Sequence, residues 1–261
     1  MRKLTYWLSL LLIFTIPWEA MVEDATLGSI TRLIGLALAA SWAIMVVTTG
    51  RIRRPTPFHV AVLLLVLWNA VSIFWSGNGA RTSQHIMTWV QLAAMVFILW
   101  DLLTTREAFQ TALQMYVAGA YVVFGNTIAN FFAGTTSHWE RFSAEGTNPD
   151  DLGIVLALGI PVALYLAGRK GAAPGGFLLK WANYAYIPAS LLGIALSGSR
   201  TALIAAMPGL LFGLVSITRV SVWAKGALAV LFVAAAFFIT PLVPQASLQR
   251  LGTTGTEVLE G

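Results

Sequence analysis

Apolar runs of about twenty residues recur along this chain, separated by short polar breaks. A run of this length crosses the hydrocarbon core of a bilayer as an α-helix, because a helix satisfies its own backbone polar groups. Only 10% of the 261 residues are charged. The sequence therefore predicts an all-α protein, a polytopic bundle of transmembrane helices. We expect nine spans: Leu4–Met21, Leu27–Thr49, Phe58–Trp75, Ile86–Leu103, Ala108–Ala133, Asp151–Gly168, Phe177–Leu196, Thr201–Ile217 and Gly226–Val243.

Basic residues sort to one side of this predicted bundle. With a cytoplasmic N-terminus, eleven of the sixteen Lys and Arg residues lie in inner segments, which is the bias that the positive-inside rule expects. The net charge of +5 is therefore a topology signal and does not indicate nucleic-acid binding. The five basic residues predicted to lie outside are Arg32, Arg81, Arg141, Arg200 and Arg250.

The predicted organisation is a transmembrane domain over residues 1–243, followed by the start of an outer loop over residues 244–261. The polar tail ends at Gly261 in a way typical of the opening of a larger loop. We therefore expect the chain to be the N-terminal portion of a longer protein. The sequence contains no cysteine, which excludes disulfides and thiolate metal sites.

The turn between spans seven and eight reads Ser197-Gly198-Ser199-Arg200. Gly198 can end one helix in a left-handed conformation, and Ser199 can cap the next. Arg200 then falls in the first helical turn, where the helix dipole disfavours a cation by about 0.3–1 kcal/mol. Two interpretations are open: Arg200 reaches lipid phosphate or an acidic loop residue, or it recognises an anion. A guanidinium matches the geometry of phosphate oxygens, so we favour anion recognition.

The outer loop before span six ends in a clear helix start. Asn148 is a good N-cap, Pro149 suits the first helical position, and the Asp150-Asp151 pair complements the dipole. Capping is thus the simpler interpretation of these residues. Earlier in the loop, Arg141 either forms a solvated ion pair with Glu145 or makes a second anion contact.

The rest of the sequence carries weaker signals. No spacing of His, Asp and Glu indicates a metal site, and no glycine-rich phosphate loop or nucleophile elbow is present. We expect His59, His85 and His138 to form hydrogen bonds at the membrane interface. Gly119 and Gly125 in span five are expected to allow close helix packing.

The two motifs, with the topology, resemble those of the O-antigen ligase and polymerase superfamily of bacterial glycan-assembly enzymes. The resemblance covers roughly residues 58–261. It departs from the family pattern at Asp150, where a second asparagine is usual, and at Thr201, where glycine is usual. The matching residues are Arg141, Ser143, Gly146, Asn148, Pro149, Ser199 and Arg200.

The resemblance implies a multi-pass protein of the bacterial inner membrane that acts in lipopolysaccharide or polysaccharide biosynthesis. Such an enzyme transfers a glycan from undecaprenyl pyrophosphate to a sugar or lipid A-core-type acceptor on the periplasmic face, without metal or cofactor. Arg200 would be catalytic, neutralising the pyrophosphate leaving group, and the substrate-binding residues would be Arg141, Asn148, Ser199 and Arg250. The family's general-base histidine lies in a large loop after the ninth span, so we expect this chain to lack it.

Two other function classes remain open. A transporter or flippase for polyprenyl-linked or other anionic solutes would place interrupted helices near the membrane midplane. A non-catalytic membrane fragment or assembly subunit would fit the expected absence of the histidine loop.

Overall fold

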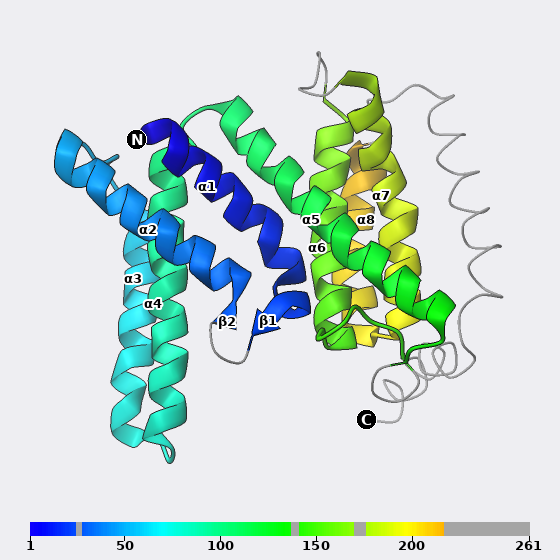
Figure 1. Cartoon of the computed structure of the whole chain (residues 1–261), viewed down its shortest axis with the longest axis horizontal. Coiled ribbons are helices and arrows are strands. Elements are labelled where there is room, and N and C mark those ends of the chain that lie inside the picture. Colours follow the sequence, from blue (N-terminus) through cyan, green and yellow to red (C-terminus); the bar gives the residue numbers. More distant parts are fainter. Residues whose placement is uncertain (25–27, 137–140, 170–175, 217–261) are drawn as a thin grey trace. The chain divides into compact units, whose positions relative to one another are not determined.

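The computed structural model describes residues 1–24, 28–136, 141–169 and 176–216, which form helices joined by short connections (Figure 1). One pair of two-residue strands, β1 (Glu23–Asp24) and β2 (Gly28–Ser29), is the exception in this part of the chain. The helices are α1 (Arg2–Thr15), η1 (Ile16–Val22), α2 (Ile30–Thr49), α3 (Pro57–Val71), η2 (Ser72–Trp75), α4 (Gly79–Leu102), α5 (Arg106–Ala133), α6 (Pro149–Ala167), α7 (Gly176–Ser197) and α8 (Arg200–Ser216).

Six helical segments in the described residues are long and apolar enough to cross a membrane. They are α1 with η1, α2, α3 with η2, α4, α5 and α6, and they coincide with the first six predicted spans. Helix α7 covers the seventh predicted span, and α8 starts where the eighth was predicted to start. The ninth span, residues 226–243, lies outside the described residues. The all-helical prediction is thus confirmed, whereas the number of nine spans and the cytoplasmic N-terminus stay predictions.

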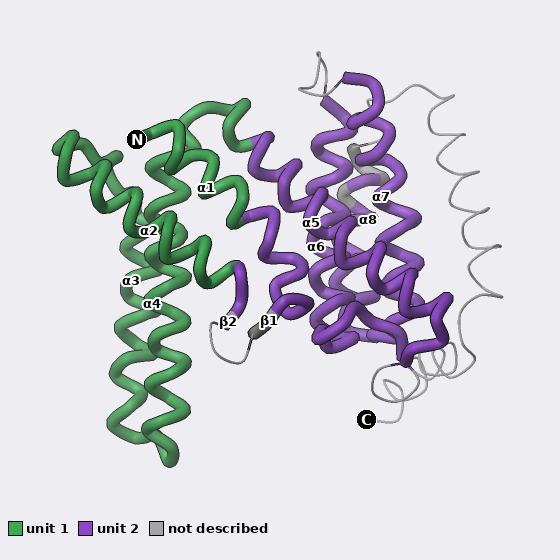
Figure 2. The backbone as a smooth tube through the Cα atoms, in the orientation of Figure 1, with its two compact units in different colours: residues 1–12, 31–109 green, residues 13–30, 110–261 purple. Residues whose placement is uncertain are grey.

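The chain divides into two compact units (Figure 2). Unit 1 comprises residues 1–12 and 31–109, and unit 2 comprises residues 13–30 and 110–261. In unit 1, α3 and α4 form a helical hairpin, and α1 meets α2 through a hydrogen bond of 2.8 Å between the Thr5 and Ser41 hydroxyls. His59 is buried at the start of α3, where its Nδ1 accepts a hydrogen bond of 3.1 Å from the backbone N–H of Thr56. This histidine therefore caps its own helix.

The core of unit 2 is built around α6, which packs against α7 and α8. Small residues permit this close packing, as is common between membrane helices. A Cβ atom at Gly159 would overlap the ring of Tyr186, whose hydroxyl donates a 3.0 Å hydrogen bond to the Leu156 carbonyl. A Cβ at Gly153 would overlap Ala202 of α8. The start of α6 is thereby held tightly against the start of α8.

The two glycines singled out in α5 behave differently. A Cβ at Gly119 would overlap the carbonyl oxygen of Phe14, so the predicted close packing is confirmed there. A Cβ at Gly125 would meet no atom of the described residues within 4 Å. The described residues thus give Gly125 no close neighbour, because spacing along a helix does not reveal which face has one.

Candidate functional site

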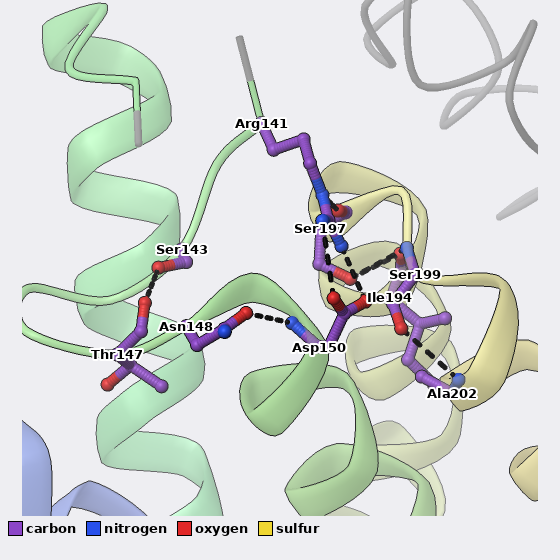
Figure 3. Close-up of polar contacts among 9 residues, drawn as sticks. All are labelled: Arg141, Ser143, Thr147, Asn148, Asp150, Ile194, Ser197, Ser199 and Ala202. Atoms are coloured by element: carbon purple, nitrogen blue, oxygen red, sulfur yellow. Dashed lines mark hydrogen bonds and ion pairs between the residues drawn. The ribbon is translucent and has the colours of Figure 1, made fainter. Parts of the chain in front are cut away.

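The two motifs identified in the sequence meet at one end of unit 2. Arg141 Nε donates a hydrogen bond of 2.5 Å to the backbone carbonyl of Ser197, and the backbone N–H of Phe142 donates one of 3.2 Å to the Leu196 carbonyl (Figure 3 shows Arg141 and Ser197). These bonds join the loop before α6 to the turn between α7 and α8. Segments more than fifty residues apart in the sequence thus form one site.

Arg141 also forms an ion pair with Asp150 in the first turn of α6 (Figure 3). Its Nη2 lies 2.7 Å from Asp150 Oδ1, and its Nη1 lies 3.4 Å from Oδ2. The arginine side chain is 10% exposed, whereas that of Asp150 is 49% exposed. The sequence left open a solvated ion pair between Arg141 and Glu145. In the described part of the chain, the carboxylate that pairs with Arg141 is that of Asp150, and the arginine side chain is largely buried.

The start of α6 has the structure that its sequence predicts. Asn148 is the N-cap, and its Oδ1 accepts a hydrogen bond of 3.0 Å from the backbone N–H of Asp150. Pro149 occupies the first helical position, and both aspartates lie in the first turn. Asp150 therefore combines two roles, because its carboxylate complements the helix dipole and also holds Arg141.

The turn between α7 and α8 is also formed as predicted. Gly198 has a φ of +58°, which a residue with a side chain rarely adopts. Ser199 is fully buried and caps α8, because its Oγ accepts a hydrogen bond of 3.3 Å from the Ala202 backbone N–H. Ser197 Oγ donates to the Ile194 carbonyl at 2.8 Å, and it accepts from the Ser199 backbone N–H at 3.3 Å. The turn is thus stabilised by hydrogen bonds among residues of the turn and of the adjoining helix ends.

Arg200 is the first residue of α8 and is half-buried. Its predicted place in the first turn is confirmed. Arg250 and His138 lie outside the described residues. His85 is exposed on α4 in unit 1, and in the described ranges no group of three or more His, Asp or Glu side chains is arranged to hold a metal ion.

Two asparagines of α5 support the loop and were missed in the sequence. Asn130 Nδ2 donates a hydrogen bond of 2.9 Å to the Ser143 carbonyl, and Asn126 Oδ1 accepts one of 2.9 Å from the backbone N–H of Glu145. Their four-residue spacing places both on one face of the helix. Asparagines inside an apolar span usually form hydrogen bonds to a neighbouring segment, so this signal was present in the sequence.

A hollow of about 800 Å³ lies beside this loop. Most of the residues that line it carry polar side chains, among them Asn130, Thr135, Ser143, Thr147, Asn148 and Asp150. Hydroxyls, amides and carboxylates at this density suit a ligand with many hydroxyl groups, which both donates and accepts hydrogen bonds.

Gly146 fixes the shape of the loop. Its φ is +67°, and a Cβ would overlap the carbonyl oxygen of Ala20. We expect Gly146→Ala to destabilise the protein by at least about 1–2 kcal/mol, because a left-handed conformation costs that much for a residue with a Cβ and the overlap with Ala20 adds to this cost. The change should be measured as the midpoint of unfolding in detergent. Gly125→Ala is the matched control, since it adds the same methyl group to open space, and equal destabilisation by both would contradict this account of the loop.

Comparison with protein-family models, with curated proteins and with solved structures found no match to this chain.

Proposed function

We propose that the chain is an inner-membrane glycan transferase of the O-antigen ligase or polymerase type. It transfers a glycan from undecaprenyl pyrophosphate to a sugar acceptor on the periplasmic face. The observation that carries this proposal is the hydrogen bond between Arg141 and Ser197, because it unites the two motifs on which the resemblance rests. A single site composed of both motifs is what a shared substrate requires.

Arg200 has the catalytic role in this proposal. Negative charge develops on the pyrophosphate as the glycosyl bond breaks, and a positioned guanidinium stabilises that charge. Arg200 is the first residue of α8, so its charge lies at the positive end of the helix dipole, where anions bind favourably. Ser199 shapes this region as the N-cap, and Arg250, outside the described residues, stays a proposed contact to the donor.

The polar loop supplies the sugar-binding part of the proposal. Arg141 is bonded to the Ser197 carbonyl and to the Asp150 carboxylate. It therefore supports binding of the glycan donor mainly by positioning the turn between α7 and α8. Asn148 and the hydroxyl-bearing residues of the hollow are suited to bind sugar hydroxyls. The glycan would thus lie beside the loop, and its pyrophosphate near the start of α8.

Deletion of the gene tests this function against transport. A cell without a transferase should make the lipid-linked glycan, move it to the periplasmic face and accumulate it there, with little glycan on the final acceptor. An impermeant glycosidase added to spheroplasts would digest the accumulated lipid-linked glycan. Accumulation protected from this enzyme would instead place the defect in transport and would support a flippase.

The proposed topology has its own test, which the absence of native cysteine makes simple. Glu145→Cys should react with an impermeant thiol reagent in intact spheroplasts, and Thr105→Cys should react only after lysis. Both positions are exposed, so a difference reports the side of the membrane. Gly146 is unsuitable as a probe because a side chain there would overlap Ala20. Labelling of position 105 alone would reverse the orientation and remove the periplasmic site.

A further inference from the structure

A second hollow, of about 580 Å³, lies in unit 1 and is lined by three arginines. We propose that it binds the phosphate of an anionic phospholipid headgroup. The residues that carry this proposal are Arg2, Arg51 and Arg53, with Asp101, Met45 and Ile52 also in the lining. We call it the basic hollow, and it is independent of the proposed transferase activity.

The lining of the basic hollow contains one carboxylate and three arginines, so its positive charge is only partly compensated. Asp101 is buried, and both of its oxygens accept hydrogen bonds from uncharged donors. Oδ1 accepts from the backbone N–H of Arg53 at 2.7 Å, and Oδ2 accepts from Trp42 Nε1 at 3.0 Å. Both oxygens of this carboxylate are thus used by structural hydrogen bonds, and three arginine residues line the same hollow.

The connection between α2 and α3 is held in place although it has no regular structure. The Arg53 guanidinium lies 3.6 Å from the centroid of a Trp100 ring and donates a 3.0 Å hydrogen bond to the Trp100 carbonyl. Trp100 Nε1 in turn donates a 3.1 Å hydrogen bond to the Arg54 carbonyl. Together with the bond to Asp101, these contacts fix the backbone beside Arg51. A preorganised site loses less conformational entropy when it binds a ligand.

The position and the apolar lining favour a lipid over a soluble anion. Arg2, Thr49 and Leu102 are end residues of three segments that are long and apolar enough to cross a membrane. Arg2 and Thr49 line the basic hollow, as does Asp101 beside Leu102. The hollow therefore lies at the depth where phospholipid headgroups lie. Met45 and Ile52 offer apolar surface to the glycerol and upper acyl chain, and basic pockets between helix ends are known to bind lipid headgroups.

Native mass spectrometry of the full chain in neutral detergent tests this site. The protein should bind phosphatidylglycerol in preference to phosphatidylcholine. Arg2→Gln with Arg51→Gln should reduce phosphatidylglycerol affinity roughly thirty-fold, since each charge near a membrane surface contributes about 1 kcal/mol. Arg51→Gln alone should reduce it about five-fold. These side chains are exposed, and Arg53 is left intact because it holds the connection.

The matched control is Arg54→Gln with Arg106→Gln, which removes two exposed charges of unit 1 that do not line the basic hollow. It should keep nearly the full preference for phosphatidylglycerol. Equal losses in the two double variants would show general charge attraction and overturn the proposal. Excess inorganic phosphate should not displace the lipid, and efficient displacement would show a soluble-phosphate site instead of a lipid site.

Discussion

Replacing Arg200 with alanine should lower glycan transfer in cells by about 100-fold or more, while the protein still inserts and folds. Removal of one preorganised group that stabilises transition-state charge has an effect of this size. Arg200→Lys should restore only part of the activity, because an ammonium keeps the charge but loses the two-pronged contact to phosphate oxygens. The measurement is surface glycan and accumulated lipid-linked glycan at matched membrane abundance of each variant.

Arg81 is the matched control for this experiment. It too lies in the first turn of a helix, α4, at a segment predicted to face outward, and it is exposed. Arg81→Ala should leave transfer near the wild-type level. If Arg200→Ala and Arg200→Lys both keep wild-type transfer, Arg200 is a lipid-facing arginine and its catalytic role is wrong.

The local features of the candidate site were predictable from the sequence. The N-cap at Asn148, the left-handed Gly198 and the cap at Ser199 each depend on residues within four positions of one another. Backbone sterics and hydrogen-bonding capacity decide such features without tertiary structure. The apolar runs likewise predicted the helices, because in a membrane the backbone has few alternatives to a helix.

The contacts between distant segments were not predictable in the same way. From the sequence, the nearby Glu145 was a possible ion-pair partner of Arg141. In the structure, Arg141 pairs with Asp150 and donates a hydrogen bond to the Ser197 carbonyl. The choice depends on how α6, α7 and the loop pack, and several acidic residues satisfy charge complementarity equally well. The partners of Asp101 were unpredictable for the same reason. They are the backbone N–H of Arg53 and the indole of Trp42, which lie 48 and 59 residues away in the sequence.

The ion pair between Arg141 and Asp150 gives a physical role to the aspartate at position 150, where this chain departs from the family pattern. Asparagine, which the resembled family usually has there, would keep a hydrogen-bond acceptor for Arg141 but lose the charge. Asp150→Asn should therefore destabilise the protein by about 1 kcal/mol, a modest cost because the carboxylate is half exposed and screened by solvent. Arg141→Ala should cost about 3 kcal/mol, since it removes charge-assisted bonds to both Asp150 and Ser197.

A double-mutant cycle separates the ion pair from these other contributions. In an Arg141→Ala background, Asp150→Asn should cost only the few tenths of a kcal/mol that the helix dipole contributes, which gives a coupling energy of roughly 0.5–1 kcal/mol in detergent unfolding measurements. Asp151→Asn is the matched control, because Asp151 shares the first turn of α6 but is exposed. It should cost a few tenths of a kcal/mol through the helix dipole, about equally in both backgrounds. If Asp151 couples to Arg141 as strongly as Asp150 does, the helix start acts through general electrostatics. A specific coupling to Asp150 would instead make the ion pair the bond through which the start of α6 and the turn carrying Arg200 are held together.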